Sequence, residues 1–467
     1  MIAGLVEAAA RETAHGELVE HLRSLLRLRT VNPPGDEILA ARHLADVLVG
    51  EGLRPEVVEP EPGRGSVVAR LRGDGTGGGP LLLLSHTDVV PAPQERWTHD
   101  PFGGDVADGY AWGRGAVDMK AMVAMELETI LLLARAAHAV GRDPASDPVP
   151  GLRRDVIFAA TADEETGGHL GAGWLVDHRP DLVRADGALN EAGGFTVELF
   201  GRRFYPIQVA EKGYLVYRIV VRGSWGHGSV PRDDNAAVLA AGVIERLALP
   251  GAQRVTPLMA EAIERVAATL PAGRGETLRH VLRRDPRVAE AAVESLCQPP
   301  LSRGLRALLR DTTSPTVVHA GVAHNVIPGC AELIVDCRIL PGTDEEAMTA
   351  ELRRRIGEEL WARCDVEVTA RGAPVEQPAA GALWETIVAA LTAHDPAAVV
   401  VPLMAPFATD AKHTVRLGIP THGFSPLRLG PQDPFLQLFH GDDERVGLDA
   451  LRFGLPVLAE VVARYCG

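Results

Sequence analysis

The segment LLLLSHTDVV at residues 81–90 places a histidine and an aspartate directly after a run of leucines. The four leucines predict a buried parallel strand, because the run is continuous and too short to span a membrane. At strand spacing, His86 and Asp88 leave the same face near the carboxyl end, where ligands bind in open α/β sheets. A metal-bound imidazole commonly gives its second N–H to a carboxylate, and Asp88 is placed to accept it. A solvated polar strand end is the alternative.

Three further carboxylates occupy glycine-rich or strand-terminal positions. Asp118 in WGRGAVDMK follows glycines that permit a tight turn, and its carboxylate could bridge two cations or cap the helix predicted at 119–134. Glu164 and Glu165 follow the apolar stretch VIFAATA. Adjacent carboxylates repel each other unless a cation separates them or one keeps a proton. One of the pair can therefore bind metal while the other acts as a base, and a solvated acidic loop is the alternative.

Glu191 in ALNEAGG and His440 in FHGDDERV lie in predicted loops, where single residues of these types are more often exposed than ligands. Taken together, two histidines and three carboxylates suit two zinc ions that share one aspartate. Glu164 is then the spare carboxylate that takes a proton from a water between the metals. The constellation predicts hydrolysis of an amide bond.

The elements that position these residues belong to a chain of 467 residues, which exceeds one ordinary core and predicts two domains. A hydrophobic content of 46% and a charged content of 23% are typical of soluble globular proteins. The net charge of -15 argues against nucleic acid and anionic membranes as partners. The first residues show no signal pattern, and no apolar run approaches the ~20 residues of a spanning helix, so we expect a cytoplasmic protein.

Cysteine and lysine usage is unusual. The five cysteines form no CxxC pair, so buried free thiols are expected, although Cys330 and Cys337 could face each other. The remaining cysteines are Cys297, Cys364 and Cys466. Lysine supplies only three of the 47 basic residues, at Lys120, Lys212 and Lys412, each in or beside a motif. Chance is the alternative to a selected role, since lysine and arginine differ mainly where geometry is tight.

The pattern of helices and strands indicates an α/β domain interrupted by an insert. Residues 1–212 and 374–467 share one pattern of helix- and strand-forming segments, and this pattern predicts that they are the two parts of the catalytic domain. Residues 213–373 predict a small α+β insert of ferredoxin-like type, because alternating strands flank helices in a βαββαβ-like order. Within the insert, 251–311 predicts an additional, mostly helical segment.

Eight motifs resemble, in order and over nearly the whole chain, those of the di-zinc aminoacylase-1, carboxypeptidase G and succinyl-diaminopimelate desuccinylase family. They are SHTDVVP, WGRGAVDMK, DEETGG, NEAGG, GHGSVP, NVIPG, DCRILPG and FHGDDERV. The long insert and FATDAKHTVRLGIPTHGFSPL are more similar to the branch of carboxypeptidase S and the N-fatty-acyl amino acid hydrolases. The resemblance implies a three-layer α/β/α catalytic domain of zinc-peptidase type with an inserted lid domain.

The same resemblance implies two zinc ions per chain, which Co²⁺ or Mn²⁺ could replace. The implied ligands are His86, Asp118 and Glu191 for one ion and Asp118, Glu165 and His440 for the other. Glu164 is implied as the general base and Asp88 as the partner of His86. Some relatives carry aspartate at the position of Glu191. A non-proline cis peptide bond is expected between Asp118 and Met119.

The insert corresponds to the lid, or dimerisation domain, of the family. His227, Asn325 and Arg338 match lid residues that polarise the scissile carbonyl and hold the substrate carboxylate in relatives. The guanidinium of Arg338 suits a carboxylate because its fork binds in two places. The alternatives are a turn histidine and a surface strand arginine. Either lid closure or a second subunit must bring His227 to the metal ligands, and a homodimer through the lid is expected.

The leading function is hydrolysis of a small-molecule substrate, either an N-acyl amino acid or a short peptide with a free C-terminal carboxylate, with dipeptidase or carboxypeptidase action as the alternative. A catalytically silent binder of acylated amino acids and a mononuclear enzyme are two further readings. Six other histidines are expected to be structural or exposed, since none pairs with a second ligand at metal spacing. They are His99, His169, His319, His324, His413 and His422.

Overall fold

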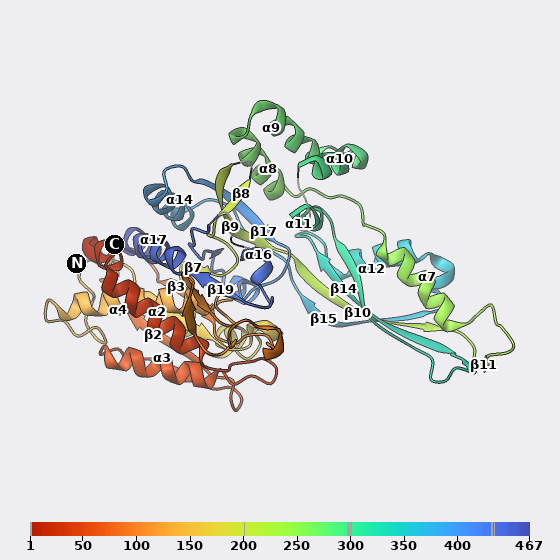
Figure 1. Cartoon of the computed structure of the whole chain (residues 1–467), viewed down its shortest axis with the longest axis horizontal. Helices are drawn as coiled ribbons and strands as arrows, with labels where there is room; N and C mark the ends of the chain where they lie inside the picture. Colours follow the sequence, from red (N-terminus) through yellow and green to blue (C-terminus); the bar gives the residue numbers. More distant parts are fainter. Residues whose placement is uncertain (1, 200, 297–300, 431–432, 434) are drawn as a thin grey trace. The chain divides into compact units, whose positions relative to one another are not determined.

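The structure is a computed structural model that describes residues 2–199, 201–296, 301–430, 433 and 435–467 (Figure 1). The chain forms two compact units. Unit 1 contains residues 1–209, 377–401 and 409–467, and unit 2 contains residues 210–376 and 402–408. The predicted insert at 213–373 lies within unit 2. The short segment 402–408, which we had expected in the second part of the catalytic domain, also belongs to unit 2.

The core of unit 1 is a mixed sheet. Its strands run in the order β1 (Glu56–Val58), β2 (Ser66–Leu71), β6 (Val156–Thr161), β3 (Leu81–His86), β7 (Gly187–Asn190), β18 (Thr421–Gly423) and β9 (Arg202–Glu211). Strand β3 is fully buried and pairs in parallel with β6 and β7, which confirms the prediction for the leucine run. His86 lies opposite Thr161 at the shared carboxyl end of β3 and β6.

Helices cover both faces of this sheet. The helices α2 (Glu12–Leu26), α4 (Lys120–His138), α14 (Ala382–His394) and α17 (Leu448–Cys466) pack in one layer, and α4 and α17 contact β3. On the opposite face, Leu82 and Leu84 share a core with Leu175 and Val176 of α5 (Ala172–His178). Because strand side chains alternate, the continuous leucine run feeds both cores. The unit therefore has the predicted three-layer α/β/α architecture.

Unit 2 contains a four-stranded antiparallel sheet in the order β12 (Thr312–Ala320), β14 (Cys330–Ile339), β10 (Gly213–Arg222) and β15 (Cys364–Gly372). The helices α7 (Ala236–Ala248) and α12 (Glu345–Ile356) pack on one face. Along the chain the order is β10, α7, β12, β14, α12, β15, which is the βαββαβ order of a ferredoxin-like fold. Strand β10 alternates between buried and partly exposed residues, as expected for a sheet covered on one face.

The described residues of the additional segment between α7 and β12 form mainly α-helices. They are α8 (Pro257–Thr269), α9 (Ala272–Arg279), α10 (Pro286–Leu296) and α11 (Leu301–Leu308). The ammonium group of Lys212 donates hydrogen bonds to the carbonyl oxygens of Ala307 and Arg310, which are 3.1 and 2.9 Å away. Ala307 lies in the last turn of α11, and Arg310 follows the end of that helix. This lysine therefore ties the end of the helical segment to the start of the sheet.

Lys120 and Lys212 are buried, and Lys412 is partly buried. Lys120 donates to the carbonyl oxygens of Leu25 and Leu28, both at 2.9 Å. The third, Lys412, is 8% exposed and donates to the carbonyl oxygen of Thr409 at 3.0 Å. Tight geometry around each ammonium group accords with a selected role for lysine at these positions.

The described cysteines are all free thiols, but not all of them are buried. Cys330 is exposed and Cys337 is buried. The two are seven residues apart on β14, so they point to opposite faces and cannot face each other. Buried thiols were therefore the wrong expectation for Cys330. Cys297 lies outside the described residues.

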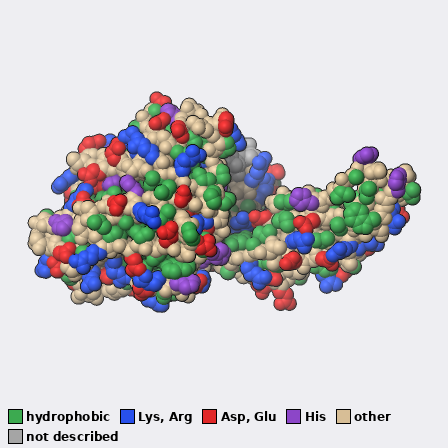
Figure 2. Space-filling model, turned by 90° about the horizontal axis from the view of Figure 1, so that it is seen from below, with side chains coloured by type: hydrophobic (Ala, Val, Ile, Leu, Met, Phe, Trp, Pro, Cys, Tyr) green, Lys and Arg blue, Asp and Glu red, His purple; other side chains and the backbone are tan. Residues whose placement is uncertain are grey.

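The surface carries charges of both signs. In the face shown in Figure 2, acidic and basic side chains are interspersed, so the excess negative charge does not form one large patch there. Among the residues that the structure describes, no helix is both long enough and apolar enough to cross a membrane.

Candidate metal centre

His86 lies at the end of β3, 1% exposed, with its two ring nitrogens in different surroundings. Its Nε2 lies 3.0 Å from Oδ1 of Asp118 and 3.7 Å from Oε2 of Glu191. Its Nδ1 lies 3.1 Å from the backbone oxygen of Asp88 and 3.4 Å from the Asp88 carboxylate. Asp88 thus contacts one ring nitrogen, and the other nitrogen faces two carboxylates.

His440 completes a second group on the other side of Asp118. Its Nε2 lies 3.4 Å from Oδ2 of Asp118 and 3.0 Å from Oε2 of Glu165. Asp118 therefore presents one oxygen to each histidine, which is the geometry of a carboxylate that bridges two cations. The side chain of His440 is 52% exposed, so this group opens towards solvent.

The two groups have the composition of metal sites. The ligand atoms of His86, Asp118 and Glu191 lie within 4.8 Å of one another, and so do those of Asp118, Glu165 and His440. Imidazole nitrogens and carboxylate oxygens are zinc ligands. Oε1 of Glu165 is buried without a hydrogen-bond partner, as expected of a ligand atom reserved for a cation. The donor set fits two ions, and the ligand roles themselves stay a prediction.

The electrostatics of the site also favour bound cations. Burial, together with the charges of Asp118 and Glu164, raises the pKa of Glu191 well above its usual range. Burial also raises the pKa of Glu165 to about 7. The hydrogen bonds to Asp118 and Glu165 raise the pKa of His440 to about 10. Without a cation these crowded carboxylates retain protons, whereas dications would neutralise them.

Asp118 is delivered by a turn and not by a helix cap. Gly115 has a φ of +90°, and a Cβ there would lie 2.7 Å from Val89, so only glycine fits. The helix α4 begins at Lys120, and no side chain caps its first turn. The alternative role of Asp118 as an N-cap is therefore wrong. The peptide bond between Asp118 and Met119 is cis, which confirms the expectation.

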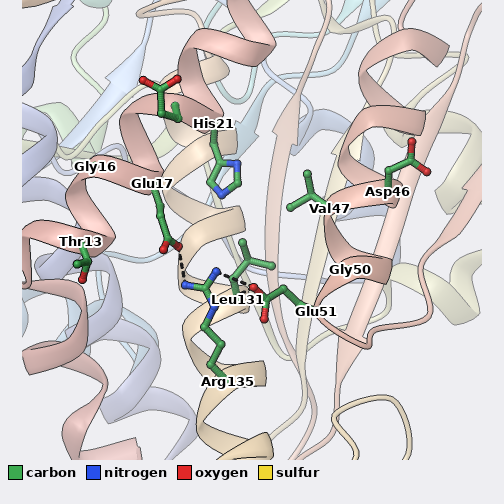
Figure 3. A pocket seen from close by; sticks show the side chains of 11 residues that line it. Thr13, Gly16, Glu17, His21, Asp46, Val47, Gly50, Glu51, Leu131 and Arg135 are labelled. Atoms are coloured by element: carbon green, nitrogen blue, oxygen red, sulfur yellow. Dashed lines mark hydrogen bonds and ion pairs between the residues drawn. The ribbon is translucent and has the colours of Figure 1, made fainter.

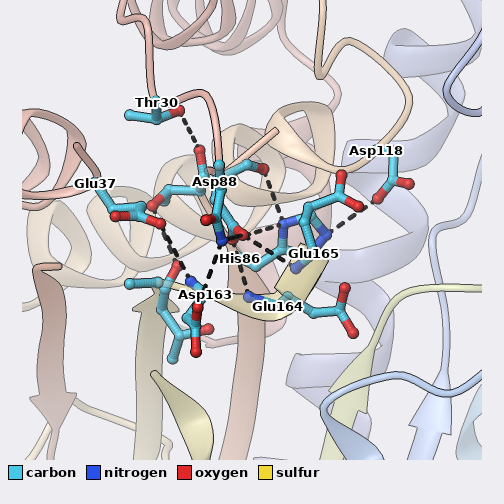
Figure 4. Close-up of polar contacts among 12 residues, drawn as sticks. Thr30, Glu37, His86, Asp88, Asp118, Asp163, Glu164 and Glu165 are labelled. Atoms are coloured by element: carbon cyan, nitrogen blue, oxygen red, sulfur yellow. Dashed lines mark hydrogen bonds and ion pairs between the residues drawn. The ribbon is translucent and has the colours of Figure 1, made fainter. Parts of the chain in front are cut away.

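Asp88 also organises the segment that carries Glu164 and Glu165 (Figure 4). Its two carboxylate oxygens accept hydrogen bonds from the backbone N–H groups of Glu164 and Glu165, at 3.1 and 3.0 Å. Asn32 donates its side-chain amide to the same carboxylate at 2.9 Å. One buried aspartate therefore fixes His86, the predicted ligand Glu165 and the predicted base Glu164 together.

Three residues of this network gave no signal in the sequence analysis: Asn32, Glu37 and Arg64. Arg64 donates to Oδ1 of Asp163 at 2.7 Å and to both oxygens of Glu37 at 2.9 Å. Asp163 has a φ of +74° and immediately precedes Glu164. The arginine thus holds the residue that turns the chain into the acidic pair. It lies 99 residues from Asp163 in sequence, so no local motif reveals it.

Glu164 belongs to neither ligand group. Its Oε1 lies 3.4 Å from the ammonium group of Lys412. Burial raises the pKa of Glu164, and the charge of Lys412 opposes that rise. A buried carboxylate beside the ligands but free of them suits a general base.

The residues predicted on the lid lie in unit 2 and do not form one cluster there. His227 and Asn325 are exposed and lie close together, because β11 (Gly226–His227) pairs with β13 (Val326–Ile327). Arg338 lies opposite Tyr214 on β10, eight positions from the Arg222–Cys330 pair at the β11 end. At about 3.4 Å per residue, Arg338 lies roughly 27 Å along the sheet from that pair. Asp336 accepts two hydrogen bonds from Arg338, at 2.8 and 2.9 Å.

The six other histidines named in the sequence analysis lie in different surroundings, and His319 and His324 among them are exposed. His413 is buried and contacts the carbonyl oxygen of Gly167 at 2.9 Å, and His422 is buried beside Trp384. Among the described residues, none of the six joins a group that could hold a metal ion.

A groove of about 810 Å³ lies elsewhere on unit 1, between α2, α3 (Ile38–Gly50) and α4. Arg135 lies in it and pairs with Glu17 and Glu51, as Figure 3 shows. The carboxylate of Glu128 is buried 3.6 Å from His21, and both its oxygens lack a hydrogen-bond partner. None of the residues that line this groove is a predicted metal ligand.

A buried histidine and carboxylate cluster at the carboxyl edge of an α/β/α sheet, with a free carboxylate beside it, defines a class of metal-dependent hydrolases. The comparisons with known proteins agree. The chain belongs to peptidase family M20/M25/M40, whose model matches residues 82–464. It is thus a metal-dependent hydrolase that acts on amide bonds.

Two curated relatives and one crystal structure illustrate the similarity. The chain is 28% identical to aminoacylase-1 of Sus scrofa over 473 residues, which cover 97% of this chain and 98% of the relative. It is also 28% identical to the N-fatty-acyl-amino acid synthase/hydrolase PM20D1 of Bos taurus, over 85% of this chain and 76% of the relative. The M20 family metallo-carboxypeptidase Sso-CP2 from Sulfolobus solfataricus has the same fold, with a TM-score of 0.68, 19% identity and coverage of 96% and 99%.

Proposed function

We propose that the protein is a cytoplasmic di-zinc amidohydrolase that cleaves N-acyl amino acids, or peptides with a free C-terminal carboxylate. The observation that carries the proposal is the pair of ligand groups sharing Asp118, with Glu164 beside them and outside both. In the proposed assignment, His86 and Glu191 bind one ion, Glu165 and His440 bind the other, and Asp118 bridges the two. Co²⁺ or Mn²⁺ could replace zinc.

The chemistry follows from these assignments. Bound zinc ions would lower the pKa of a water molecule and polarise the amide carbonyl. Glu164 takes a proton from that water and delivers it to the departing amine. The ammonium group of Lys412, 3.4 Å from Glu164, favours the charged carboxylate that accepts the proton. The Asp88 carboxylate positions the base Glu164 and the ligand Glu165 by accepting hydrogen bonds from their backbone N–H groups.

We assign recognition of the substrate carboxylate to Arg338. Asp336 uses the Nε and one NH2 hydrogen of the guanidinium. A guanidinium has five N–H donors, so its other edge stays available to a carboxylate. The names of the relatives, which include an aminoacylase and an N-fatty-acyl-amino acid hydrolase, favour an acylated amino acid as the substrate. Carboxypeptidase or dipeptidase action is the alternative, because the crystal structure with the same fold is a carboxypeptidase.

We further propose that unit 2 is a lid that pairs two copies of the chain and supplies His227 and Asn325 to the partner's site. Strand β12 is the outer strand of its sheet, and Val317, Val318 and Val322 around it are exposed. An exposed apolar strand edge favours pairing with a second copy. A silent binder is disfavoured because all five predicted ligands and the predicted base are present.

The test is a panel of N-acyl amino acids and dipeptides, each with a free and an amidated carboxyl group. Chelation is expected to abolish hydrolysis, and Zn²⁺ or Co²⁺ to restore it, with about two metal ions per chain by elemental analysis. Amidated substrates should be poor, and Arg338→Ala should mainly raise KM for the free acids. The Glu164→Gln variant, purified identically, controls for contaminating hydrolases.

Three outcomes decide between the readings. Turnover of dipeptides alone favours the alternative, and one metal ion per fully active chain indicates a mononuclear enzyme. No hydrolysis of any substrate by the metal-loaded protein contradicts the proposal.

A further inference from the structure

Two segments of unit 1 that lie far apart in sequence deliver Asp118 and His440, and one buried ion pair joins them. Arg114 precedes Asp118 by four residues, and Glu444 follows His440 by four. Arg114 is 2% exposed and Glu444 is fully buried. Nη1 of Arg114 donates a hydrogen bond to Oε2 of Glu444 at 2.6 Å. The pair thus couples positions 330 residues apart.

Glu444 does more than pair with the arginine, because backbone groups of the Asp118 turn donate to it. Its Oε1 accepts the N–H groups of Val117 and Asp118, at 2.7 and 3.1 Å, and its Oε2 accepts the N–H of Gly115 at 3.1 Å. Both oxygens are therefore saturated by donors. A buried carboxylate with three N–H partners and one guanidinium partner is a rigid anchor for the turn.

Arg114 extends the same connection to His440. Its Nη2 lies 3.4 Å from the backbone oxygen of His440. Just beyond the pair, β5 (Tyr110–Trp112) and β19 (Arg445–Gly447) form an antiparallel ladder, with Trp112 opposite Arg445. The ladder and the ion pair together hold the two segments side by side.

We propose that Glu444, together with Arg114, is a positioning pair that sets Asp118 and His440 at the spacing required by the second metal ion. The inference rests on the proposed two-metal site. Neither residue supplies a ligand atom in the predicted groups, so the pair acts through the backbone of the ligands. It is the counterpart of Asp88, which accepts the N–H groups of Glu164 and Glu165 in the same way.

The substitution Glu444→Gln separates this role from simple volume. A glutamine has nearly the same shape, but its amide nitrogen is a donor and cannot accept. Whichever way the amide points, at least one backbone N–H of the turn loses its acceptor. Partners that orient metal ligands typically contribute 10- to 100-fold in metal affinity. We therefore expect Glu444→Gln to bind one ion like the parent and the other about 10- to 100-fold more weakly.

A matched control exists in the same unit. Glu126 on α4 is also fully buried, and its only described partner is the hydroxyl of Ser85 at 2.7 Å. Burial raises the pKa of Glu126 well above its usual range, so glutamine mimics its protonated form. Glu126→Gln is expected to retain both metal affinities. His440→Ala gives the reference behaviour of a chain that has lost the second ion.

The measurement is a zinc titration of each full-length apo variant against a competing chelator, without substrate, together with apo melting temperatures. The expected result is selective weakening of one ion, matching the ion lost in His440→Ala, and recovery of activity at raised zinc concentration. A purely structural role for Glu444 would instead weaken both ions together. Should Glu444→Gln fail to fold, Arg114→Lys keeps the charge and removes the contact to His440, and the same selective loss is expected.

The outcomes separate this inference from the function it rests on. Two unchanged zinc affinities in both variants overturn the positioning role and leave the two-metal enzyme intact. A parent chain that binds fewer than two ions overturns the proposed site, and the positioning role falls with it.

Discussion

The polar residues singled out on the two units differ in how far the fold already brings them together. In unit 1, His86, Asp118 and Glu165 lie within hydrogen-bonding range of a partner in the cluster, and they are largely buried. In unit 2, His227 is exposed, and its described hydrogen-bond partners are the hydroxyl and backbone N–H of Ser229. Arg338 lies on β14 of the four-stranded sheet, whereas His227 lies on the separate two-stranded sheet of β11 and β13.

The difference shows which part of the chemistry is preorganised. A ligand cluster must exist before the metal arrives, so its side chains are fixed by buried carboxylates that accept backbone N–H groups. Residues that recognise the substrate can remain apart until the substrate, or a second chain, is bound. Three substitutions test this contrast.

The largest effect is expected in unit 1. Glu164→Gln should keep both metals and the fold while kcat falls by roughly 10²–10⁴, because the general base is lost. Glu165→Gln is the matched neighbour and should lower metal binding instead. Elemental analysis and kcat, measured on both variants, check the pair. The reverse pattern would show that ligand and base are exchanged.

An intermediate effect is expected for the exposed histidine of unit 2. His227→Ala should lower kcat by about 10²–10³, because the developing oxyanion loses a donor. Mixing His227→Ala with Glu164→Gln under subunit exchange should restore up to about a quarter of the parent activity, since random pairing leaves one intact site in half of the dimers.

The control for this experiment is His280→Ala, a histidine of the additional helical segment that should keep full activity. If mixing restores nothing although exchange is verified independently, His227 serves its own chain. Unit 2 would then have to act by closure.

The smallest effect is expected for Glu128, a buried carboxylate of unit 1 that lies outside the metal centre. Its substitution tests whether such a carboxylate affects stability alone. Burial, and then the charge of Glu17, raise the pKa of Glu128 from 4.5 to about 8. The folded state therefore holds a proton that the unfolded chain releases above about pH 4.5, and this contribution to stability is lost as the pH rises through 8.

Glu128→Gln removes that titration. As the pH rises from 5 to 8, the stability of the variant relative to the parent should increase by up to about 4 kcal/mol. Thermal unfolding at both pH values measures the gain, and activity should not change. Glu20→Gln, which changes an exposed carboxylate lining the groove between α2, α3 and α4, is the matched control. A loss of metal in Glu128→Gln would contradict the separation of groove and metal centre.

Much of the fold could be predicted because its signals are local. The leucine run identifies β3, and the alternating pattern of YLVYRIVVR identifies β10. The βαββαβ order follows from the succession of such segments. The assignment of 402–408 to unit 2 could not be predicted, because the contact that ties it there joins distant residues: the N–H of Lys212 donates to the carbonyl oxygen of Ala405 in β17 (Val399–Ala405) at 3.0 Å. Pairing over that distance leaves no mark on the residues themselves.

The candidate site divides in the same way. Side chains that need a particular chemical type, such as His86 or Asp118, lie in recognisable motifs. The residues that hold them do not, because an arginine or a glutamate in a loop is usually a surface residue. Arg64 and Glu444 become significant only through contacts with Asp163 and Asp118, 99 and 326 positions away. The sequence therefore predicts the ligands better than their supports.

The contacts of every lysine with backbone carbonyl groups give the molecule a built-in reporter of unfolding. An endoproteinase that cleaves only after lysine has three sites in the whole chain, at Lys120, Lys212 and Lys412, and each ammonium group is held by backbone carbonyls. The native protein should resist such digestion. Cleavage after Lys212 would report that unit 2 has opened, and cleavage after Lys120 or Lys412 that unit 1 has opened. Fragment sizes alone then reveal which unit gives way first.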